Sequence, residues 1–334
     1  MKKKKVTLKM LSEKLPYSIS TISKALNDSE EISVEAKRVI VETAGNMGYR
    51  SALGSVVVDK TVAVILPDVR NDFFAQALHG IQEEASANHY NVITCITRES
   101  HDKEVAHIRS LAKKGIDGFI VAVSEETQTQ RNYDHFNDLI VNDVPLVMFD
   151  RVVEEVDCDK ITIDDIKSGE KAVNALIQSG DRNIGMVSTI SNLSVGQLRE
   201  EGIRRRLSHF SDAMLHVIRA TDQVKFTQSI ADLFAKEQVQ SIIALDQIAG
   251  ILTLNFARSQ GIKVPEDLQI ICYSNGLLSQ HSYPPMTVID QHAADLGKST
   301  FNHLFNMLSS DAKVKMTSAH TLQSSLLKRG TTRN

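Results

Sequence analysis

The chain has 334 residues, too many for one ordinary domain, and its apolar content of 42% is enough to build two or three hydrophobic cores. A net charge of −3 at pH 7 argues by itself against a nucleic-acid-binding protein, and three widely spaced cysteines argue against a disulfide framework. No apolar run approaches the roughly 18–20 residues that span a membrane. Because no apolar segment follows the N-terminal lysines, we expect a cytoplasmic protein without a signal peptide.

Residues 6–26 predict two short helices joined by a tight turn. Thr7 can cap the first helix and Ser18 the second, because both side chains offer an oxygen to an unpaired backbone N–H. A third helix fits residues 33–47, where apolar residues recur at helical spacing, and Gly48 is suited to end it. The second helix carries small polar and basic side chains near its start, which suits entry into the DNA major groove.

The charges are unevenly distributed along the chain. Residues 1–60 contain 11 Lys and Arg against 7 Asp and Glu, whereas the remainder contains 27 against 34. A basic head on an acidic body is typical of a protein that contacts DNA at one end only. We interpret residues 51–60 as the linker between the two parts.

After the linker, predicted strands and helices alternate in two sets. The first set contains strands at 62–66, 91–97, 118–123 and 145–149 and helices at 74–88, 103–114 and 133–141. The second set, beginning at Ile161, contains helices at 168–179, 196–209, 227–237 and 249–260 and strands at 183–187, 215–219, 241–245 and 268–273. This alternation predicts parallel sheets with helices on both faces, hence two doubly wound α/β lobes. Ligands of such folds bind at the carboxyl ends of the strands, here in a cleft between the lobes.

The sequence contains no convincing catalytic or metal-binding motif. Residues 297–300 (GKST) imitate the end of a phosphate-binding loop, but His292 stands where the first glycine is required. The adjacent Asp164 and Asp165 are interpreted as loop and cap residues, and the eleven histidines form no ligand pattern. We therefore predict no catalytic residue, no metal site and no cofactor.

Motifs in the head and the body occur in one order along nearly the whole chain. The head motifs are Val6-Thr7-Leu8, Ser18, Thr21-Ile22-Ser23-Lys24-Ala25-Leu26-Asn27 and Gly48-Tyr49, and the body motifs include VILPDVRNDFFAQALHGI, KKGIDGFIVAVS, VPLVMFDR, NLSVGQLREEG, GIKVPEDLQIICYSNG and LLKRGTT. In this combination the chain resembles the LacI/GalR family of bacterial transcription regulators. The resemblance implies a small all-α helix-turn-helix head on a periplasmic-binding-protein-like body. It also implies a homodimer on a pseudo-palindromic operator in double-stranded DNA, regulated by a small effector between the lobes.

The resemblance assigns DNA contacts to the second predicted helix and its neighbours. Ile19, Ser20 and Lys24 align with base-reading positions. The expected phosphate contacts are Thr7, Thr21, Ser23 and Asn27. The alternative is a solvated helix face with Ile19 in the core of the head. Pro16 stands where the family usually has a turn glycine, and because proline fixes φ, we expect a different turn shape.

The linker also departs from the family pattern. From Tyr49 to Val62 there are 13 positions, about four fewer than is usual, so roughly one turn of the family's hinge helix is missing. In the family this helix inserts a leucine into the minor groove, and Leu53 is the only leucine left here. We expect the hinge helix to be truncated or absent and the operator to be bent less. A full central kink with an ordered hinge helix would contradict this hypothesis.

For the effector, the resemblance and the strand ends together indicate residues on both lobes. Asp150 can accept hydrogen bonds from two adjacent sugar hydroxyls, and Arg199 aligns with the family's effector-binding arginine. The full predicted set is Asn71, Phe73, Phe74, Asp150, Arg199, Asp246, Ser274 and Asn275. The alternative roles are helix N-caps for Asp150, Asp246 and Ser274 and a surface salt bridge for Arg199. Leu245 and Ser274 replace an Asn and an Asp that are frequent in the family, which argues against the usual way of binding a monosaccharide.

The predicted domains are a DNA-binding head at 1–50, the shortened linker at 51–60, an N-terminal lobe at 61–161 plus about 289–321, and a C-terminal lobe at 162–288 plus about 322–330. The favoured function is a repressor of carbohydrate-uptake or catabolic genes. The alternatives are a two-lobed solute-binding receptor without a gene-regulatory role and an enzyme on an α/β scaffold. No heptad pattern follows Arg329, so a coiled-coil tetramer is not expected.

Overall fold

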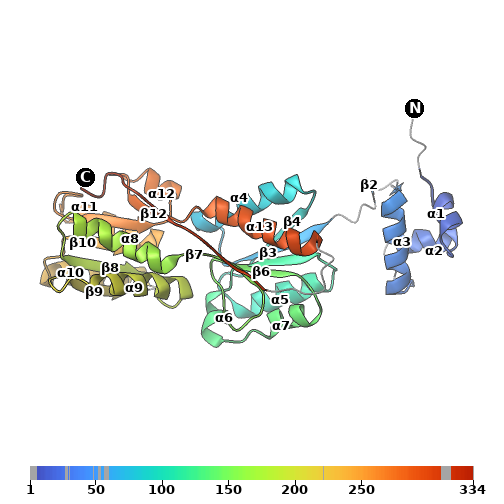
Figure 1. Cartoon of the computed structure of the whole chain (residues 1–334), viewed down its shortest axis with the longest axis horizontal. Helices are drawn as coiled ribbons and strands as arrows, with labels where there is room; N and C mark the ends of the chain where they lie inside the picture. Colours follow the sequence, from blue (N-terminus) through green and yellow to red (C-terminus); the bar gives the residue numbers. More distant parts are fainter. Residues whose placement is uncertain are drawn as a thin grey trace, which may run out of the picture. The chain divides into compact units, whose positions relative to one another are not determined.

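The computed structural model describes residues 6–26, 29, 31–47, 49–51, 54–55, 60–220, 222–309 and 317–333. The chain divides into two compact units, Met1–Lys60 and Thr61–Asn334. The first unit is called the head below and the second the body (Figure 1).

The head contains helices α1 (Leu8–Lys14), α2 (Ile19–Leu26) and α3 (Val34–Met47). Thr7 caps α1 by accepting a hydrogen bond from the Met10 N–H, and Ser18 accepts one from the Thr21 N–H. Five buried side chains pack the three helices together: Leu11, Ile22, Ala25, Ile40 and Ala44. Between α1 and α2, Leu15 is extended, as expected for a residue before proline.

The described part of the linker is strand rather than helix. Strands β1 (Arg50–Ser51) and β2 (Gly54–Ser55) form a short antiparallel pair. Leu53 lies outside the described residues, so its predicted role in the minor groove stays a prediction. The same holds for the predicted loss of the hinge helix on DNA.

The N-terminal lobe is a six-stranded parallel sheet in the order β13-β7-β6-β5-β3-β4. Its strands are β3 (Thr61–Leu66), β4 (Asn91–Ile96), β5 (Gly118–Val121), β6 (Leu146–Phe149), β7 (Asp159–Ile163) and β13 (Ala319–Leu322). Its helices are α4 (Asp72–Ala87), α5 (His101–Ala112), α6 (Glu125–Gln130), α7 (Asp134–Val141) and α13 (Ala293–Ser309). Successive residues of β3 enter different cores: Val64 packs with α4 and α13, and Ile65 with α5 and α7. Both faces of the sheet are therefore covered (Figure 1).

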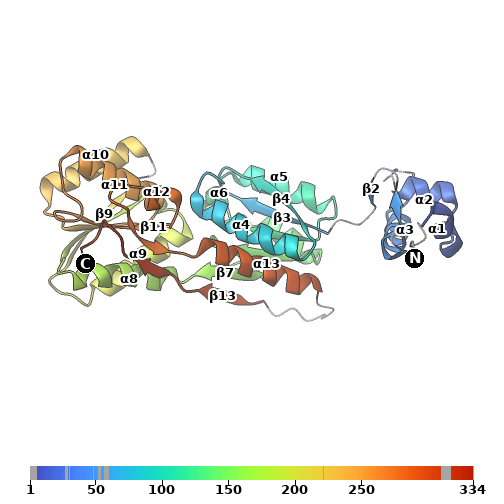
Figure 2. The same cartoon turned by 90° about the horizontal axis from the view of Figure 1, so that it is seen from above.

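The C-terminal lobe has the sheet order β14-β12-β11-β10-β8-β9, in which only β14 is antiparallel to its neighbour. Its strands are β8 (Asn183–Ser188), β9 (Met214–Arg219), β10 (Ser241–Ala244), β11 (Gln269–Tyr273), β12 (Thr287–Asp290) and β14 (Ser325–Leu327). Its helices are α8 (Asp165–Gln178), α9 (Ser194–Leu207), α10 (Gln223–Lys236), α11 (Gln247–Ser259) and α12 (Leu277–Gln280). Helices α8 and α9 cover one face, and α10 and α11 the other (Figure 2). The predicted fold class, a small helical head and a body of two doubly wound lobes, is confirmed.

One boundary between the lobes was predicted wrongly. The second set of elements was expected to begin at Ile161, but β7 pairs in parallel with β6, with Phe149 opposite Ile161, and so belongs to the first sheet. The chain crosses to the second lobe only after β7, returns after β12, and crosses again between β13 and β14. These crossings put the carboxyl ends of the strands of both sheets around one shared cleft.

The phosphate-loop imitation is part of a helix. Residues 297–300 lie inside α13, and a Cβ at Gly297 would meet the backbone carbonyl carbon of Ala77 at 2.9 Å. Gly297 therefore allows α13 to pack closely against α4, which explains the glycine without a phosphate.

Candidate effector cleft and DNA-binding head

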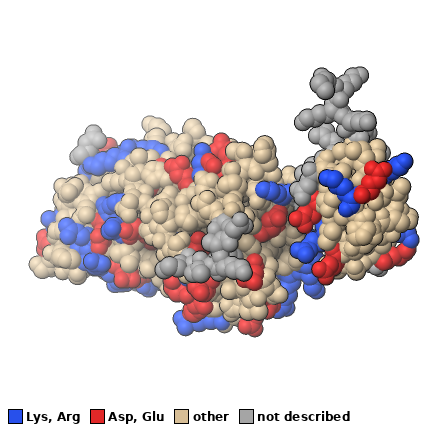
Figure 3. Space-filling view, turned by 45° about the vertical axis from the view of Figure 1, so that its right-hand side comes forward, with Lys and Arg blue, Asp and Glu red and all other residues tan. Residues whose placement is uncertain are grey.

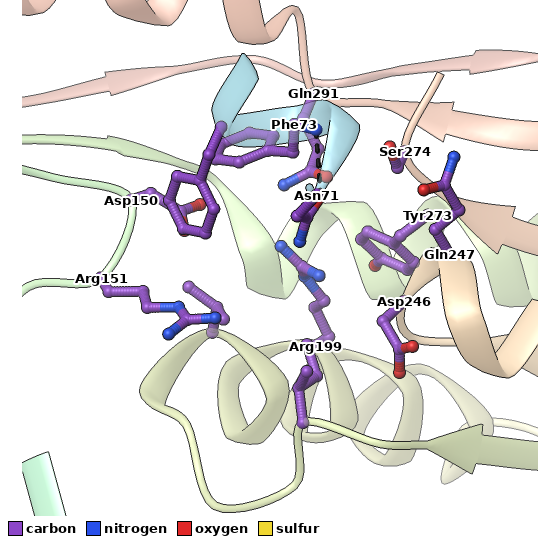
Figure 4. A pocket seen from close by; sticks show the side chains of 13 residues that line it. Asn71, Phe73, Asp150, Arg151, Arg199, Asp246, Gln247, Tyr273, Ser274 and Gln291 are labelled. Atoms are coloured by element: carbon purple, nitrogen blue, oxygen red, sulfur yellow. Dashed lines mark hydrogen bonds between the residues drawn. The ribbon is translucent and has the colours of Figure 1, made fainter. Parts of the chain in front are cut away.

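A polar cavity of about 40 Å³ lies between the two lobes (Figure 4). In this closed form the space holds only a few water molecules, since one water needs roughly 10–15 Å³. Its lining residues are Asn71, Phe73, Phe74, Asp150, Arg151, Ile190, Val195, Arg199, Asp246, Gln247, Tyr273, Ser274 and Gln291. Seven of the eight predicted effector residues are thus brought together, and Asn275 is the exception.

Arg199 is a buried member of an ion pair, not part of a surface salt bridge. Its side chain is 4% exposed, and its Nε donates to Oδ1 of Asp165 at 2.7 Å. Its Nη1 donates to the Leu245 carbonyl at 2.8 Å, and the guanidinium lies 4.3 Å from the centre of the Tyr273 ring. The arginine is therefore fixed before any ligand arrives, with its donors arranged by the C-terminal lobe alone.

Asp165 was interpreted wrongly from the sequence. Its neighbour Asp164 is the N-cap of α8 and accepts a hydrogen bond from the Lys167 N–H at 3.0 Å. Asp165 instead turns inward beside Arg199, where burial raises the pKa of its carboxyl group against the opposing effect of that guanidinium. Two adjacent aspartates at a helix start are equivalent in sequence, and only the packing of α8 shows which one is buried.

Asp150 follows β6 and lies on the opposite wall of the cavity from Arg199. It caps no helix, and its carboxylate receives no hydrogen bond from any described residue. Burial raises its pKa to about 6, although Arg199 and Arg151 act to lower it. The next residue, Arg151, is held by Glu99 through Nη1, 2.7 Å from each carboxylate oxygen. The cavity therefore contains a buried carboxyl group, that of Asp150, whose pKa is close to neutral pH.

The two other predicted polar residues of the C-terminal lobe behave differently. Asp246 is the N-cap of α11 and accepts hydrogen bonds from the Ala249 N–H and from Thr189, so its alternative role as a cap is confirmed. Ser274 caps no helix, is 6% exposed, and its buried Oγ has no hydrogen-bond partner among the described residues. Asn275 turns away from the cavity, where its amide donates to Asp290 at 2.9 Å.

Sequence reasoning missed six lining residues: Arg151, Ile190, Val195, Gln247, Tyr273 and Gln291. Three of them are adjacent in sequence to a predicted effector residue at a strand end, and this adjacency was the available signal. Arg151 follows Asp150, Gln247 follows Asp246, and Tyr273 precedes Ser274. Gln291 follows β12, which the sequence pattern did not predict.

In the head, the predicted base-reading residues lie on α2. Ile19 is 47% exposed and is therefore not a core residue of the head. Ser20 is exposed, and its hydroxyl is 2.8 Å from that of Ser18. Lys24 is also exposed and forms an ion pair with Glu31.

The remaining predicted phosphate contacts are placed only in part. Thr7 is the N-cap of α1 and Ser23 lies within α2. The Thr21 hydroxyl lies 2.8 Å from that of Ser18. Asn27 lies outside the described residues.

On the face of the molecule seen in Figure 3, acidic and basic side chains of the body are interspersed, with no field of a single sign.

A family model described as periplasmic binding proteins and sugar binding domain of LacI family matches residues 59–326. The chain belongs to the LacI/GalR family. Among curated relatives, it is similar to the HTH-type transcriptional regulator DegA of Bacillus subtilis, with 24% identity over 307 residues that cover 88% of each chain. It is also similar to catabolite control protein A of Priestia megaterium, with 26% identity over 302 residues, 87% of this chain and 89% of the relative.

Solved structures of the LacI/GalR family share the fold of the body. A LacI family transcriptional regulator from Enterococcus faecium, solved with bound ribose, has a TM-score of 0.72 and 23% identity. The match covers 82% of this chain and 98% of that one.

No described helix of the present chain is long and apolar enough to cross a membrane. In the same described ranges, no three His, Cys, Asp or Glu side chains are grouped as metal ligands would be.

Proposed function

We propose that this LacI/GalR chain is an effector-responsive, sequence-specific DNA-binding regulator that represses carbohydrate-uptake or catabolic genes. The observation that carries the proposal is the two-lobed body, whose cleft contains a fixed arginine, a buried carboxyl group and an unpartnered hydroxyl. The same chain has a basic helical head, and its named relatives are transcriptional regulators. These features favour regulation over the alternatives of an exported solute receptor or an enzyme. Because operators lie in the cytoplasm of bacteria, we place the protein there.

The proposed effector is a small polyhydroxylated molecule. Asp150 would accept hydrogen bonds from adjacent hydroxyls, Arg199 would donate to a ring or hydroxyl oxygen, and Ser274 would supply a neutral partner. Phe73 and Phe74 meet edge to face at 5.2 Å and line the same cavity, which suits the apolar face of a sugar ring. The related regulator of Enterococcus faecium was solved with ribose, which makes D-ribose the first candidate to test.

The proposed DNA-binding surface is α2 with its flanking residues. Ile19, Ser20 and Lys24 would contact base edges, while Thr7, Thr21, Ser23 and Asn27 would contact phosphates. Leu53 would contact the minor groove. As in the family, the active species would be a homodimer with two heads on one pseudo-palindromic operator.

The proposed domain organisation follows from the predicted boundaries. We assign residues 1–50 to the DNA-binding head, 51–60 to the linker and the rest to the two effector lobes. The division of the structure into compact units after Lys60 supports this assignment. The strand order moves the crossing between the lobes from 161/162 to the segment after Ile163.

The decisive experiment combines an electrophoretic shift on genomic fragments with thermal unfolding in the presence of small ligands. A repressor should keep its preference for particular fragments over bulk DNA as salt rises, while its affinity falls steeply. A ligand at 100 times its dissociation constant should stabilise the body by about 2.7 kcal/mol. D-ribose, other sugars, sugar phosphates and nucleosides form the panel. Equal binding to all DNA fragments at every salt concentration would rule out the proposal.

Lys24→Ala is expected to weaken operator binding about tenfold to a hundredfold, or roughly 1–3 kcal/mol, and to relax base preference at one position. The substitution removes the ammonium group that would donate hydrogen bonds to a base edge, and it also removes one positive charge. Lys14→Ala is the matched control, because it removes one positive charge from the last turn of α1 and leaves α2 unchanged. It should weaken all sequences about equally. Selection of bound sequences from a library of randomised operators measures the affinity and the base preference of both variants. Equal losses of base preference in the two variants would refute the role of Lys24.

A further inference from the structure

Asp72 and Gly276 meet across the cleft, at the rim formed by α4 and α12. Asp72 is the first residue of α4 in the N-terminal lobe, and Gly276 is the N-cap of α12 in the C-terminal lobe. If a Cβ atom is built on Gly276, its three nearest neighbours all belong to Asp72: Cβ at 2.6 Å, Cγ at 2.7 Å, and Oδ2 closer still. Atoms in proteins do not approach one another this closely, so the closed cleft leaves no room for a side chain at position 276.

The backbone of Gly276 does not itself require glycine. Its φ of −89° and ψ of 176° lie in the extended region, which every L-residue adopts. Gly276 is buried in the closed form, yet the atoms that would obstruct a side chain come from the opposite lobe. The glycine is therefore explained by closure and not by the local conformation of its own lobe.

Polar contacts fix Asp72 at this rim. Oδ2 of Asp72 accepts a hydrogen bond from Nε2 of Gln247, the first residue of α11, at 3.1 Å. One helical turn further along α4, Nε2 of Gln76 donates to the Asn275 carbonyl at 3.4 Å. The rim thus joins α4 to the residues that directly follow Ser274 in the cavity wall.

The two lobes also meet at a second rim. There α6 contacts the start of α9: Nδ2 of Asn192 donates to Glu125 at 3.2 Å, and the Ser194 N–H donates to Oε1 of Gln128 at 3.0 Å. Backbone and side-chain groups at this second rim meet with ordinary hydrogen-bond spacing. Of these two rims, the one between α4 and α12 combines a hydrogen bond with a position at which a Cβ atom would overlap the side chain of a residue in the opposite lobe.

We propose that Asp72 and Gly276 are the steric determinant of lobe closure in this chain. With glycine at position 276, the Asp72 carboxylate packs against the start of α12 and the cleft closes. With any side chain at that position, the two lobes stay apart at this rim. The inference deepens the proposed function, because closure is the change through which an effector would act on the head. Its test needs neither effector nor DNA, so its failure is distinct from the failure of that function.

The test measures how often the α4–α12 rim closes. Gln76 and Gln280 both donate to the Asn275 carbonyl, at 3.4 and 3.0 Å, so cysteines at these two positions lie within reach of a short bismaleimide only when the rim is shut. The full-length background is Q76C/Q280C with Cys95→Ser, since Cys158 and Cys272 are buried. The initial cross-linking rate reports the closed population.

Gly276→Ala is expected to slow cross-linking by at least about tenfold. Asp72→Asn/Gly276→Ala should stay equally slow, because asparagine fills the same space as aspartate. Asp72→Gly/Gly276→Ala should return to within about twofold of the background, because it removes the side chain that the new methyl group meets. Leu277→Ala, at the exposed neighbouring position, is the control for an alanine substitution at the start of α12 and should leave the cross-linking rate unchanged.

Three outcomes would overturn the proposal. An unchanged rate in Gly276→Ala would show that the methyl group is accommodated. Rescue by Asp72→Asn as complete as that by Asp72→Gly would show that charge, not volume, controls the rim. No rescue by Asp72→Gly, with cooperative thermal unfolding retained, would show that the methyl group added at position 276 acts within the C-terminal lobe alone.

Discussion

Replacing Arg199 with methionine is expected to lower the free energy of unfolding by about 3–5 kcal/mol. The arginine is 4% exposed and its partner Asp165 is 4% exposed, so the substitution leaves a carboxylate buried with no opposite charge at 2.7 Å. Urea unfolding at pH 7, followed by circular dichroism, measures the loss. A loss below about 1 kcal/mol would mean that water reaches Asp165 and that the pair is not buried in solution.

Two further variants separate the charge from the packing. Asp165→Leu/Arg199→Met removes both charges and is expected to recover most of the lost stability, because apolar residues of similar volume often replace a buried pair without cost. Arg204→Met is the matched control on the same helix. Arg204 pairs with Glu200 one turn away, but its side chain is 51% exposed, so its loss should change the unfolding free energy by less than about 1 kcal/mol.

The Arg199→Met defect should grow as pH rises. Burial already raises the pKa of Asp165, and removing the guanidinium that opposes this effect raises that pKa further. A carboxyl group whose folded pKa exceeds its unfolded value favours the folded state when protonated and disfavours it when ionised. The variant should therefore be closer to the wild type at pH 5 than at pH 8. The opposite trend would show that Asp165 is not the group left unpaired.

This energetic role changes how effector experiments on Arg199 are interpreted. A loss of effector response in Arg199→Ala would follow from unfolding as readily as from a lost ligand contact. The Asp165→Leu/Arg199→Met protein, if it is stable, isolates the contact, because its body is folded while the guanidinium is missing. An unchanged thermal response to a bound sugar in that protein would remove Arg199 from the proposed site.

The positions of the cleft residues were predictable where a strand end marks them. Asn71, Asp150 and Ser274 follow β3, β6 and β11, and the carboxyl ends of parallel strands must meet the cleft. Asp165 was not predictable, because either of two adjacent aspartates can cap a helix and the burial of the second depends on Arg199, 34 positions away. The crossing after β7 was missed for a similar reason: a single strand carries no sign of which sheet it will join.

Asp150→Asn is expected to make the protein more stable at pH 8 while it weakens effector binding. Burial raises the pKa of Asp150 from 3.8 to about 6, so ionisation of this carboxyl group opposes folding. The stability that comes from the protonated form is fully present below pH 3.8 and is lost as pH rises through about 6. The complete loss is on the order of 3 kcal/mol, of which roughly 1–2 kcal/mol falls between pH 5 and pH 8.

Asparagine keeps the shape of Asp150 but cannot ionise, so the stability difference between variant and wild type should widen from pH 5 to pH 8. Urea unfolding of both proteins across this range measures this difference. A polyhydroxylated effector that donates to the ionised carboxylate should bind the wild type more tightly as pH rises through about 6, and the variant with no such dependence. Parallel stability profiles for the two proteins would show that Asp150 is solvated. An effector affinity equally independent of pH in both would show that Asp150 is not the group that holds the ligand.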